Sequence, residues 1–324
     1  MARLRHPDVL ATLLLLLLPL VFFRETLFGG KVLLPTDNLF QWEPWRSYAA
    51  QFGVGALQNQ LLSDLILENY VWKRFIVECL RQGELPLWNP YLFGGVPFLA
   101  AGQHSALYPL SILFYVLPVA HAFAYVTALN FFLGELFMYL FLCRLGARRL
   151  GALVGAVAYA FSGFMVVSVV FPMVVSAAIW LPLLLLVIEM AVQRAERGQR
   201  LSLLLPAAGA VVVGVQFFAG HVEISLYVLI VAGFYTACRL ATLLWRKGWR
   251  PTLSPAVQAL SMVALGGALA AVQIVPLFEL VSQNFRQGSA SYEQVVSWAF
   301  TWRNALTFLI PDLWGNPSHT SYFD

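Results

Sequence analysis

The sequence predicts an all-α polytopic membrane protein built from a bundle of transmembrane helices. Hydrophobic residues make up 60% of the 324 residues and charged residues only 11%, whereas a soluble domain has about 25% charged residues. The mean hydropathy is +0.74. Apolar runs long enough to cross a hydrocarbon core, about 20 residues each, recur along the chain with short basic breaks between them. These observations exclude a soluble multidomain protein.

The apolar runs predict seven membrane spans, of which only the first is short. Arg3 and Arg5 precede this first span as in a signal peptide, but no small-residue cleavage site follows Phe23, which favours an uncleaved anchor. The seven segments are about 9–23, 121–143, 151–170, 173–192, 201–219, 222–243 and 256–281.

The distribution of basic residues predicts a cytoplasmic N-terminus in the cell membrane. Three loops on one side are rich in arginine and lysine, whereas the opposite turns near Pro172 and Gly220 contain neither. Basic loops stay in the cytoplasm, so residues 24–120 and 282–324 should lie outside the cell. The basic loop residues are Arg144, Arg148, Arg149, Arg194, Arg197, Arg200, Arg246, Lys247 and Arg250.

We expect residues 1–324 to form a single membrane domain, the N-terminal part of a longer protein, because no closing helix follows LIPDLWGNP. The net charge of +4 reflects arginines beside apolar runs, so no nucleic-acid partner is expected. Cys79, Cys143 and Cys238 have no paired spacing, which gives neither a disulfide framework nor a zinc motif.

The long outer loop at 24–120 is predicted to carry a helix that lies in the membrane interface. Ser63 can cap a helix that begins at Asp64, and Gly83 can end it. Lys73, Arg74 and Arg81 should point away from the apolar side of this helix, as in interfacial helices. That apolar side consists of Val71, Trp72, Phe75, Ile76, Cys79 and Leu80.

A turn segment, GELPLWNPYLFGGVPF, follows this helix. Its prolines prevent a further helix, and Gly94 and Gly95 permit tight turns. Trp88 and Tyr91 would anchor the segment at the interface. An aromatic belt explains these rings but leaves the acids of the loop unexplained.

The loop acids are candidates for chemistry, because a carboxylate can act as a general base or hold a metal beside a leaving phosphate. Solvated surface charge is the alternative for any one of them. They are Asp37, Glu43, Asp64, Glu68, Glu78 and Glu84.

Several motifs in a fixed order resemble those of the YfhO-type bacterial membrane proteins. They are LLPTDNLFQWEPWRSY, LLSDLILENYVWKRFIVECLRQGELPLWNPYLFGGVPFLAAGQHSALYPL, AYAFSGFMVVSVVFPMVVSAAIWLPLLLL, FFAGHVEISLYVL and TFLIPDLWGNP, which together cover nearly the whole chain.

This resemblance implies a GT-C-like glycosyltransferase fold with a long first extracytoplasmic loop. Such enzymes take a sugar from a polyprenyl-phosphate carrier on the outer face, and the acceptor would be an envelope polymer, a lipid or a protein. The resemblance also implies a catalytic aspartate in the first outer loop. Asp64 in LLSDLILENY is the first choice and Asp37 in LPTDNLF the second. One would act as the base and the other through a divalent metal, Mg²⁺ or Mn²⁺, if one is needed.

The chain departs from the expected family pattern at Glu68 and Asn69, where Gln and Tyr would be common, so the contacts to the acceptor are open. Arginines in the outer loop could neutralise a phosphate leaving group, since guanidinium donates two parallel hydrogen bonds. His221 and Glu223 could bind a donor phosphate or metal, or merely face interfacial water, and His104 could be structural. The substrate-binding candidates are Glu68, Trp88, Asn89, His104, His221, Glu223 and Arg74.

Glu135 lies well inside the second predicted span, where insertion of a charge costs about 3 kcal/mol. A proton-linked role and hydrogen bonding to Asn130 or Tyr139 are equally good explanations. Two other functions therefore stay open beside sugar transfer: a transporter or flippase of lipid-linked sugars, and a noncatalytic protein of envelope assembly.

Overall fold

The computed structural model describes residues 6–59, 62–283, 291–297 and 299–316. The chain divides into two compact units. Unit 1 comprises Met1–Leu33 and Trp72–Phe278, and unit 2 comprises Leu34–Val71 and Glu279–Asp324. The described residues are mainly helical, which confirms the all-α polytopic membrane fold; the strands described are only two residues each.

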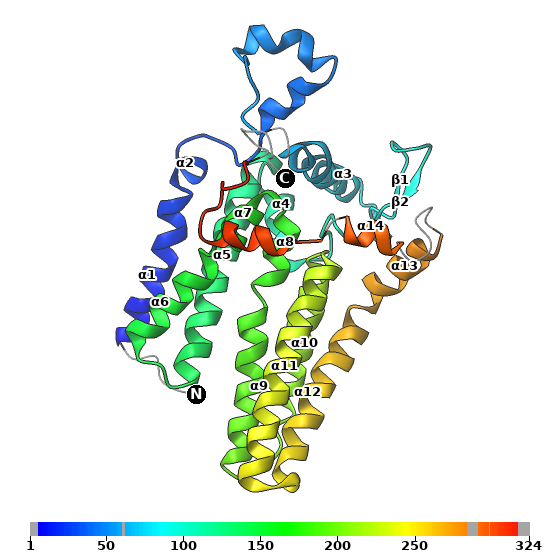
Figure 1. The fold of residues 1–324 in the computed structure, drawn as a ribbon. Helices are drawn as coiled ribbons and strands as arrows, with labels where there is room; N and C mark the ends of the chain where they lie inside the picture. Colours follow the sequence, from blue (N-terminus) through cyan, green and yellow to red (C-terminus); the bar gives the residue numbers. More distant parts are fainter. Residues whose placement is uncertain (1–5, 60–61, 284–290, 298, 317–324) are drawn as a thin grey trace. The chain divides into compact units, whose positions relative to one another are not determined.

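Five helical segments of unit 1 are long and apolar enough to cross a membrane. They are α5 (Val119–Arg144), α6 with α7 and η7 (Arg149–Val170), α8 with α9 (Pro172–Glu196), α11 (Val222–Lys247) and α12 (Trp249–Leu269) (Figure 1). Three further apolar helices are shorter: α1 (His6–Phe22), α10 (Leu204–Phe218) and α13 (Ala271–Ser282).

Each predicted span is therefore helical, but the lengths differ from the prediction. The fifth span is short as well as the first, because α10 has only 15 residues and at 1.5 Å per residue falls short of a core about 30 Å thick. The seventh is interrupted at Ala270, where α12 ends and α13 begins.

Two spans change direction where their helices are interrupted. The third breaks at Phe161 and Ser162, whose side chain caps α7 (Gly163–Val167) by accepting from Met165 N. The fourth breaks at Ile179 and Trp180, between α8 (Pro172–Ala178) and α9 (Leu181–Glu196), where Pro182 occupies the first turn of α9. Proline suits a first turn because its missing N–H has no helical partner there.

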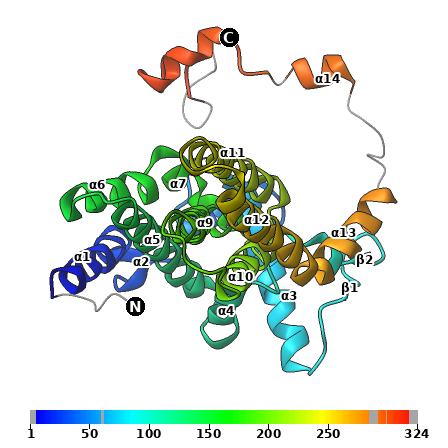
Figure 2. The ribbon, with the colours of Figure 1, turned by 90° about the horizontal axis from the view of Figure 1, so that it is seen from below.

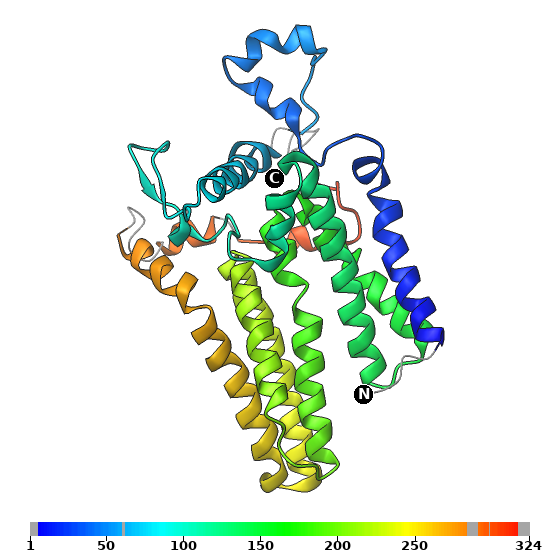
Figure 3. The same ribbon diagram turned by 180° about the vertical axis from the view of Figure 1, so that it is seen from behind.

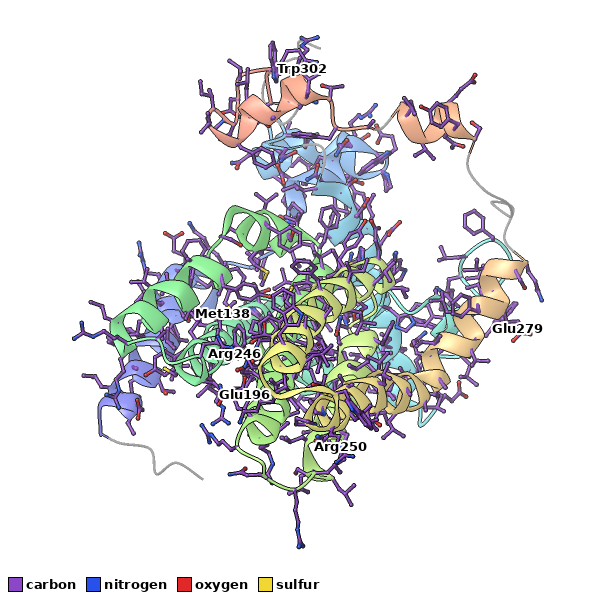
Figure 4. The ribbon with its side chains drawn as sticks, turned by 60° about the horizontal axis from the view of Figure 1, so that its bottom comes forward. Met138, Glu196, Arg246, Arg250, Glu279 and Trp302 are labelled. Atoms are coloured by element: carbon purple, nitrogen blue, oxygen red, sulfur yellow. The ribbon has the colours of Figure 1, made fainter. Side chains whose placement is uncertain are left out.

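The three basic loops lie at the same end of unit 1, as the positive-inside argument requires (Figures 1 and 3). Which side of the membrane this end faces stays a prediction. The arginines and acids here pair with one another: Arg239 holds Glu189 with two bonds of 2.8 and 2.9 Å and Glu196 with one of 3.0 Å. Figure 4 shows Glu196, Arg246 and Arg250 near this end.

Helix α9 forms the centre of the larger hydrophobic core. Its side chains pack against α5, α10, α11 and α12, and the view along the bundle shows these helices around it (Figure 2). A second core joins α1 and α2 (Arg24–Leu27) to α5 and α8 through Phe23, Phe131 and Ile179. Helix α5 belongs to both cores.

The predicted interfacial helix is present, but its buried side differs from the prediction. Helix α3 (Tyr70–Arg81) ends before Gly83, which has a positive φ of 75° as expected of a helix stop. It buries Lys73, Ile76 and Val77 and leaves Val71 and Leu80 exposed. The expectation that Lys73 points away from the buried side was wrong, because the rest of the outer loop folds over this lysine.

The turn segment forms a small hairpin with Gly94 and Gly95 at its tip, both at positive φ. Strands β1 (Trp88–Asn89) and β2 (Val96–Pro97) pair antiparallel, with Trp88 opposite Pro97. Short helical turns follow: η5 (Leu99–Ala101), η6 (Pro109–Ser111) and α4 (Ile112–Val116).

Unit 2 consists of turns and short helices. Its first segment contains the 3-10 helices η1 (Thr36–Gln41) and η2 (Trp45–Phe52), followed by the π-helical turn η4 (Leu65–Asn69). Its second contains α14 (Tyr292–Val296) and η8 (Trp302–Phe308), in which Arg303 lies over the Trp314 ring at 4.8 Å. That residues 1–324 form a single domain stays a prediction.

The later part of the outer loop docks on the turn between α10 and α11. Ser105 Oγ donates to the Ala219 carbonyl at 2.7 Å, and Gln273 Nε2 donates to the Leu99 carbonyl at 2.9 Å. Gly220 allows this approach: it has φ +91°, and a β-carbon there would lie 2.4 Å from the Gly102 carbonyl oxygen.

We predict that Gly220→Ala lowers the thermal stability of the detergent-purified protein. The substitution adds backbone strain, roughly 1 to 3 kcal/mol, and pushes the docked loop away. Gly233→Ala in α11 is the control, since a β-carbon there meets nothing within 4 Å. Equal melting temperatures for the two variants would show that the docking is not tight.

Candidate functional site

A polar hollow in unit 2 contains the predicted acid Asp37. Its volume is about 570 Å³, and the chain around it comes from η1 and from the stretch after η2. Two other hollows, of about 340 and 600 Å³, lie between membrane helices and are lined almost wholly by apolar side chains. The hollow at Asp37 therefore has the polar lining that chemistry on a polar substrate needs. It is lined by Leu34, Pro35, Thr36, Asp37, Asn38, Gly53, Val54, Gly55, Ala56, Gln58, Asn59 and Leu62.

Hydrogen bonds between its two walls hold this hollow in shape. The half-buried Asp37 accepts the backbone N–H of Gln58 at Oδ2, at 3.0 Å. The fully buried Asn38 donates from Nδ2 to the Asn59 carbonyl at 2.9 Å and accepts from Gln41 Nε2 at 2.6 Å. The Asp37 carboxylate is thus oriented by a backbone group and faces the hollow.

Asp64, the first choice for the catalytic aspartate, lies directly before the π-helical turn η4, which packs against η1. Asp64 and Glu68 are both exposed and stand one turn apart. Burial, and then the charge of Asp64, raise the pKa of Glu68. Single π-helical turns are rare and are often found at functional sites. The structure thus brings the elements that carry Asp37, Asp64 and Glu68 together within unit 2.

His104 in unit 1 is a structural residue in this arrangement. It is buried, stacks on Phe98 with ring centroids 4.3 Å apart, and bonds through Nε2 to the Phe98 carbonyl at 2.9 Å. Its Nδ1 accepts the Ala106 N–H at 3.0 Å. Burial and the nearby Lys73 charge lower its pKa to about 4. Since both ring nitrogens are bonded to backbone, neither remains for a substrate.

The other candidates of unit 1 have local partners. Asn89 is buried and accepts the Tyr91 N–H at 3.0 Å, which is a turn-forming bond. His221 caps α11 by accepting Ile224 N at 3.2 Å, and burial lowers its pKa although Glu223 opposes this. Glu223 accepts from Tyr227 at 2.5 Å.

Trp88 and Arg74 are exposed. The Trp88 indole lies over Gly95, where a β-carbon would meet it at 2.4 Å. Because unit 1 carries Trp88, Asn89, His104, His221, Glu223 and Arg74 and unit 2 carries the three acids, the prediction that all of them share one site stays a prediction.

A divalent metal, if used, would be held by few protein ligands. No group of three or more histidine, cysteine or acidic residues forms a metal site among the described residues. Mg²⁺ needs only one or two carboxylates when phosphate supplies further oxygens. The Asp64 and Glu68 pair fits that role, because a cation would relieve the repulsion from Asp64 that adds to burial in raising the pKa of Glu68.

Comparison with known proteins identifies the family. The family described as "Bacterial membrane protein YfhO" matches residues 103–313. The chain belongs to the YfhO family. No match was found among curated proteins or among solved structures.

The sequence did not predict that Lys73 of this YfhO-family chain is buried and holds the outer loop together. It is buried, and its Nζ donates to the His104 carbonyl at 2.6 Å and to Ser111 Oγ at 3.1 Å. The ring of Phe114 lies 4.6 Å from the same atom. Burial lowers the pKa of Lys73 to about 7. Lys73 fastens the loop that follows the hairpin, and only the fold reveals its partners, which are 31 to 41 residues further along the chain.

We predict that the stability of this fold rises with pH between about 7 and 10.5. The folded pKa of Lys73 is about 7 and its ordinary value is 10.5, so in this range the unfolded chain binds the proton that the folded chain lacks, and raising the pH favours folding. Unfolding midpoints of the wild type and Lys73→Met across this range check it. The difference between the two should change with pH; a constant difference would contradict the lowered pKa.

Proposed function

We propose that this YfhO-family protein transfers a sugar from a polyprenyl-phosphate donor to an acceptor of the cell envelope on the outer face of the membrane. The observation that supports this best is the polar hollow with Asp37 in its wall. Thr36, Gln58 and Asn59, with their hydroxyl and amide groups, line the same hollow. Amides, hydroxyls and carboxylates together offer the donors and acceptors that sugar hydroxyls require.

In the proposed reaction Asp37 acts as the general base. Its carboxylate takes the proton of the acceptor hydroxyl, the acceptor oxygen bonds to the anomeric carbon, and the bond from that carbon to the donor phosphate oxygen breaks. The polyprenyl phosphate leaves with the electron pair. The backbone bond from Gln58 N to Asp37 holds the carboxylate in place before the substrate arrives, which avoids reorganisation during the reaction.

Asp64 and Glu68 would then serve the leaving group. A Mg²⁺ or Mn²⁺ ion held by this pair supplies positive charge beside the donor phosphate. The family resemblance made Asp64 the first choice for the catalytic aspartate and Asp37 the second, and this assignment reverses that order by giving the role of base to Asp37. It rests on the place of Asp37 in the hollow and on the exposed, mutually repelling pair at Asp64 and Glu68.

We predict that Asp37→Asn abolishes sugar transfer while membrane insertion is kept. The amide cannot accept the acceptor proton, and loss of a general base lowers a rate by about 10²- to 10⁴-fold. Envelope glycans of a strain that lacks the gene and carries each variant would be compared by mass analysis. Asp64→Asn should also reduce the product, by removing a ligand of the metal.

Glu43→Gln is the matched control. Glu43 is an exposed acid of the same loop that bonds only to Ser47 among the described contacts and does not line the hollow. Its variant should retain the product. Full product with both Asp37→Asn and Asp64→Asn would refute sugar transfer by these acids and favour a transporter of lipid-linked sugars.

A further inference from the structure

Glu135 is a buried acid of α5 that sugar transfer does not use. It is 0% exposed, and neither carboxylate oxygen has a hydrogen-bond partner among the described residues. Most buried polar side chains in proteins are hydrogen-bonded, and an ionised, unpaired carboxylate is very costly in an apolar medium. At rest this side chain is therefore best accommodated as the neutral acid.

The two nearby groups that could satisfy Glu135 bind elsewhere. Asn130 donates to Ser176 Oγ at 2.9 Å and accepts from Tyr108 at 3.3 Å. Tyr139 donates to Asp8 at 3.3 Å. A structural hydrogen bond therefore does not explain why an acid occupies this position.

The side chains about one helical turn before Glu135 on α5 belong to apolar clusters: Phe131 to the core of α1, α2, α5 and α8, and Phe132 to the cluster of α1, α5 and α6. Met138, three residues further along α5 and labelled in Figure 4, packs against both the α9 core and the cluster between α1 and α6. Glu189 on α9 does not serve as a partner, because it bonds to Arg239, Tyr235 and Gln193.

The titratable and charged groups on the elements packed against α5 are few, and α8 contributes none. They are Asp8 on α1, Arg24 and Glu25 on α2, Tyr115 on α4, Arg149 and Tyr159 on α6, and Glu189, Arg194 and Glu196 on α9, besides His121, Tyr125, Tyr139, Cys143 and Arg144 of α5 itself.

A line of polar groups leads from Glu135 to the end of unit 1 with the basic loops. Glu135 and Tyr139 are four residues apart, which places them on the same side of the helix with about 6 Å between β-carbons. Tyr139 contacts Asp8, and Asp8 accepts from Arg149 Nε at 2.7 Å. Asp8 and Arg149 are partly exposed, with 26% and 47% of their side chains accessible. Beyond Tyr139 this line therefore reaches the surface of unit 1, at the end with the basic loops.

We propose that Glu135 is a proton-binding site within the membrane that exchanges its proton through Tyr139 with the Asp8 and Arg149 pair. A proton on Asp8 passes to the Tyr139 oxygen while the Tyr139 hydroxyl proton passes to the Glu135 carboxylate, after a rotamer change of Glu135 closes the gap. Tyr139 ends neutral, and one proton has moved from Asp8 to Glu135. The reverse sequence releases it.

Labelling of the full-length protein in membrane vesicles with dicyclohexylcarbodiimide tests this proposal. The reagent enters the lipid phase and reacts with protonated carboxyl groups. Peptide mass spectrometry should find an adduct on Glu135 that decreases as the pH rises from about 5 to about 9, and none on Glu189, which is ion-paired with Arg239. Absence of an adduct on Glu135 across this range, or an adduct on Glu189 to the same extent, would overturn the proposal.

Tyr139→Phe tests the route. Without the hydroxyl, labelling of Glu135 should respond to a pH jump at least tenfold more slowly than in the wild type, whereas Tyr159→Phe, on α6 and bonded to the Ala178 carbonyl, should respond as the wild type does. Equal response rates for wild type and Tyr139→Phe would overturn exchange through this residue. Neither measurement involves sugar transfer, so its outcome is separate from that of the proposed function.

Discussion

The organisation of this protein depends on the demand that an apolar solvent makes on polar groups: inside the hydrocarbon region only the protein itself can satisfy a hydrogen bond. The backbone meets this demand by forming helices, and where helices are interrupted a side chain takes over, as Ser162 does by capping α7. At one end of unit 1 the same demand is met by charge pairing, in which Arg239 satisfies Glu189 and Glu196 together. Lys73 shows a third solution, since its partners are a carbonyl, a hydroxyl and an aromatic ring, none of them charged. The contacts of Arg239 and of Lys73 join segments that are distant in the sequence, so satisfying these polar groups also fixes the packing.

The features that the sequence could predict are those set by local composition. Apolar length located the five helical segments that are long enough to cross a membrane, because comparing a length with the bilayer thickness depends on no distant residue. Gly83, Gly94 and Gly95 marked turns correctly, since glycine, which lacks a β-carbon, adopts a positive φ without steric cost. Helix interruptions at Phe161, Ile179 and Ala270 were not predicted, because tertiary packing decides them.

The candidate site was predictable in its acids but not in its geometry. Asp37, Asp64 and Glu68 were among six candidate acids of the long outer loop, and the family resemblance put Asp64 and Asp37 forward as catalytic. The hollow around Asp37, however, depends on hydrogen bonds over 21 residues, from Asn38 to Asn59 and from Gln58 to Asp37. The burial of Lys73 was missed for a similar reason: in a helical pattern a lysine counts as polar, and no local signal announces the Ser111 hydroxyl and His104 carbonyl that receive it. For His104 the sequence left both substrate binding and a structural role open, because an isolated histidine in a sequence says nothing of its neighbours. In the fold its two nitrogens complete the same loop that Lys73 fastens.

Glu135 and Glu189 are two buried acids of the same bundle with opposite surroundings. Glu189 is equally buried, yet four hydrogen bonds, one each from Gln193 and Tyr235 and two from the ion-paired Arg239, stabilise its ionised form. A protein able to surround Glu189 in this way could have done so at Glu135, but the polar neighbours of Glu135 on α5 are engaged with Ser176 and Asp8 instead. Packing alone would favour a leucine or methionine at such a place, because an apolar side chain of similar volume removes the penalty of burial. An acid left without partners in the centre of a two-core helix is thus explained by what it can bind and release, and the smallest ligand that fits a closed apolar site is a proton.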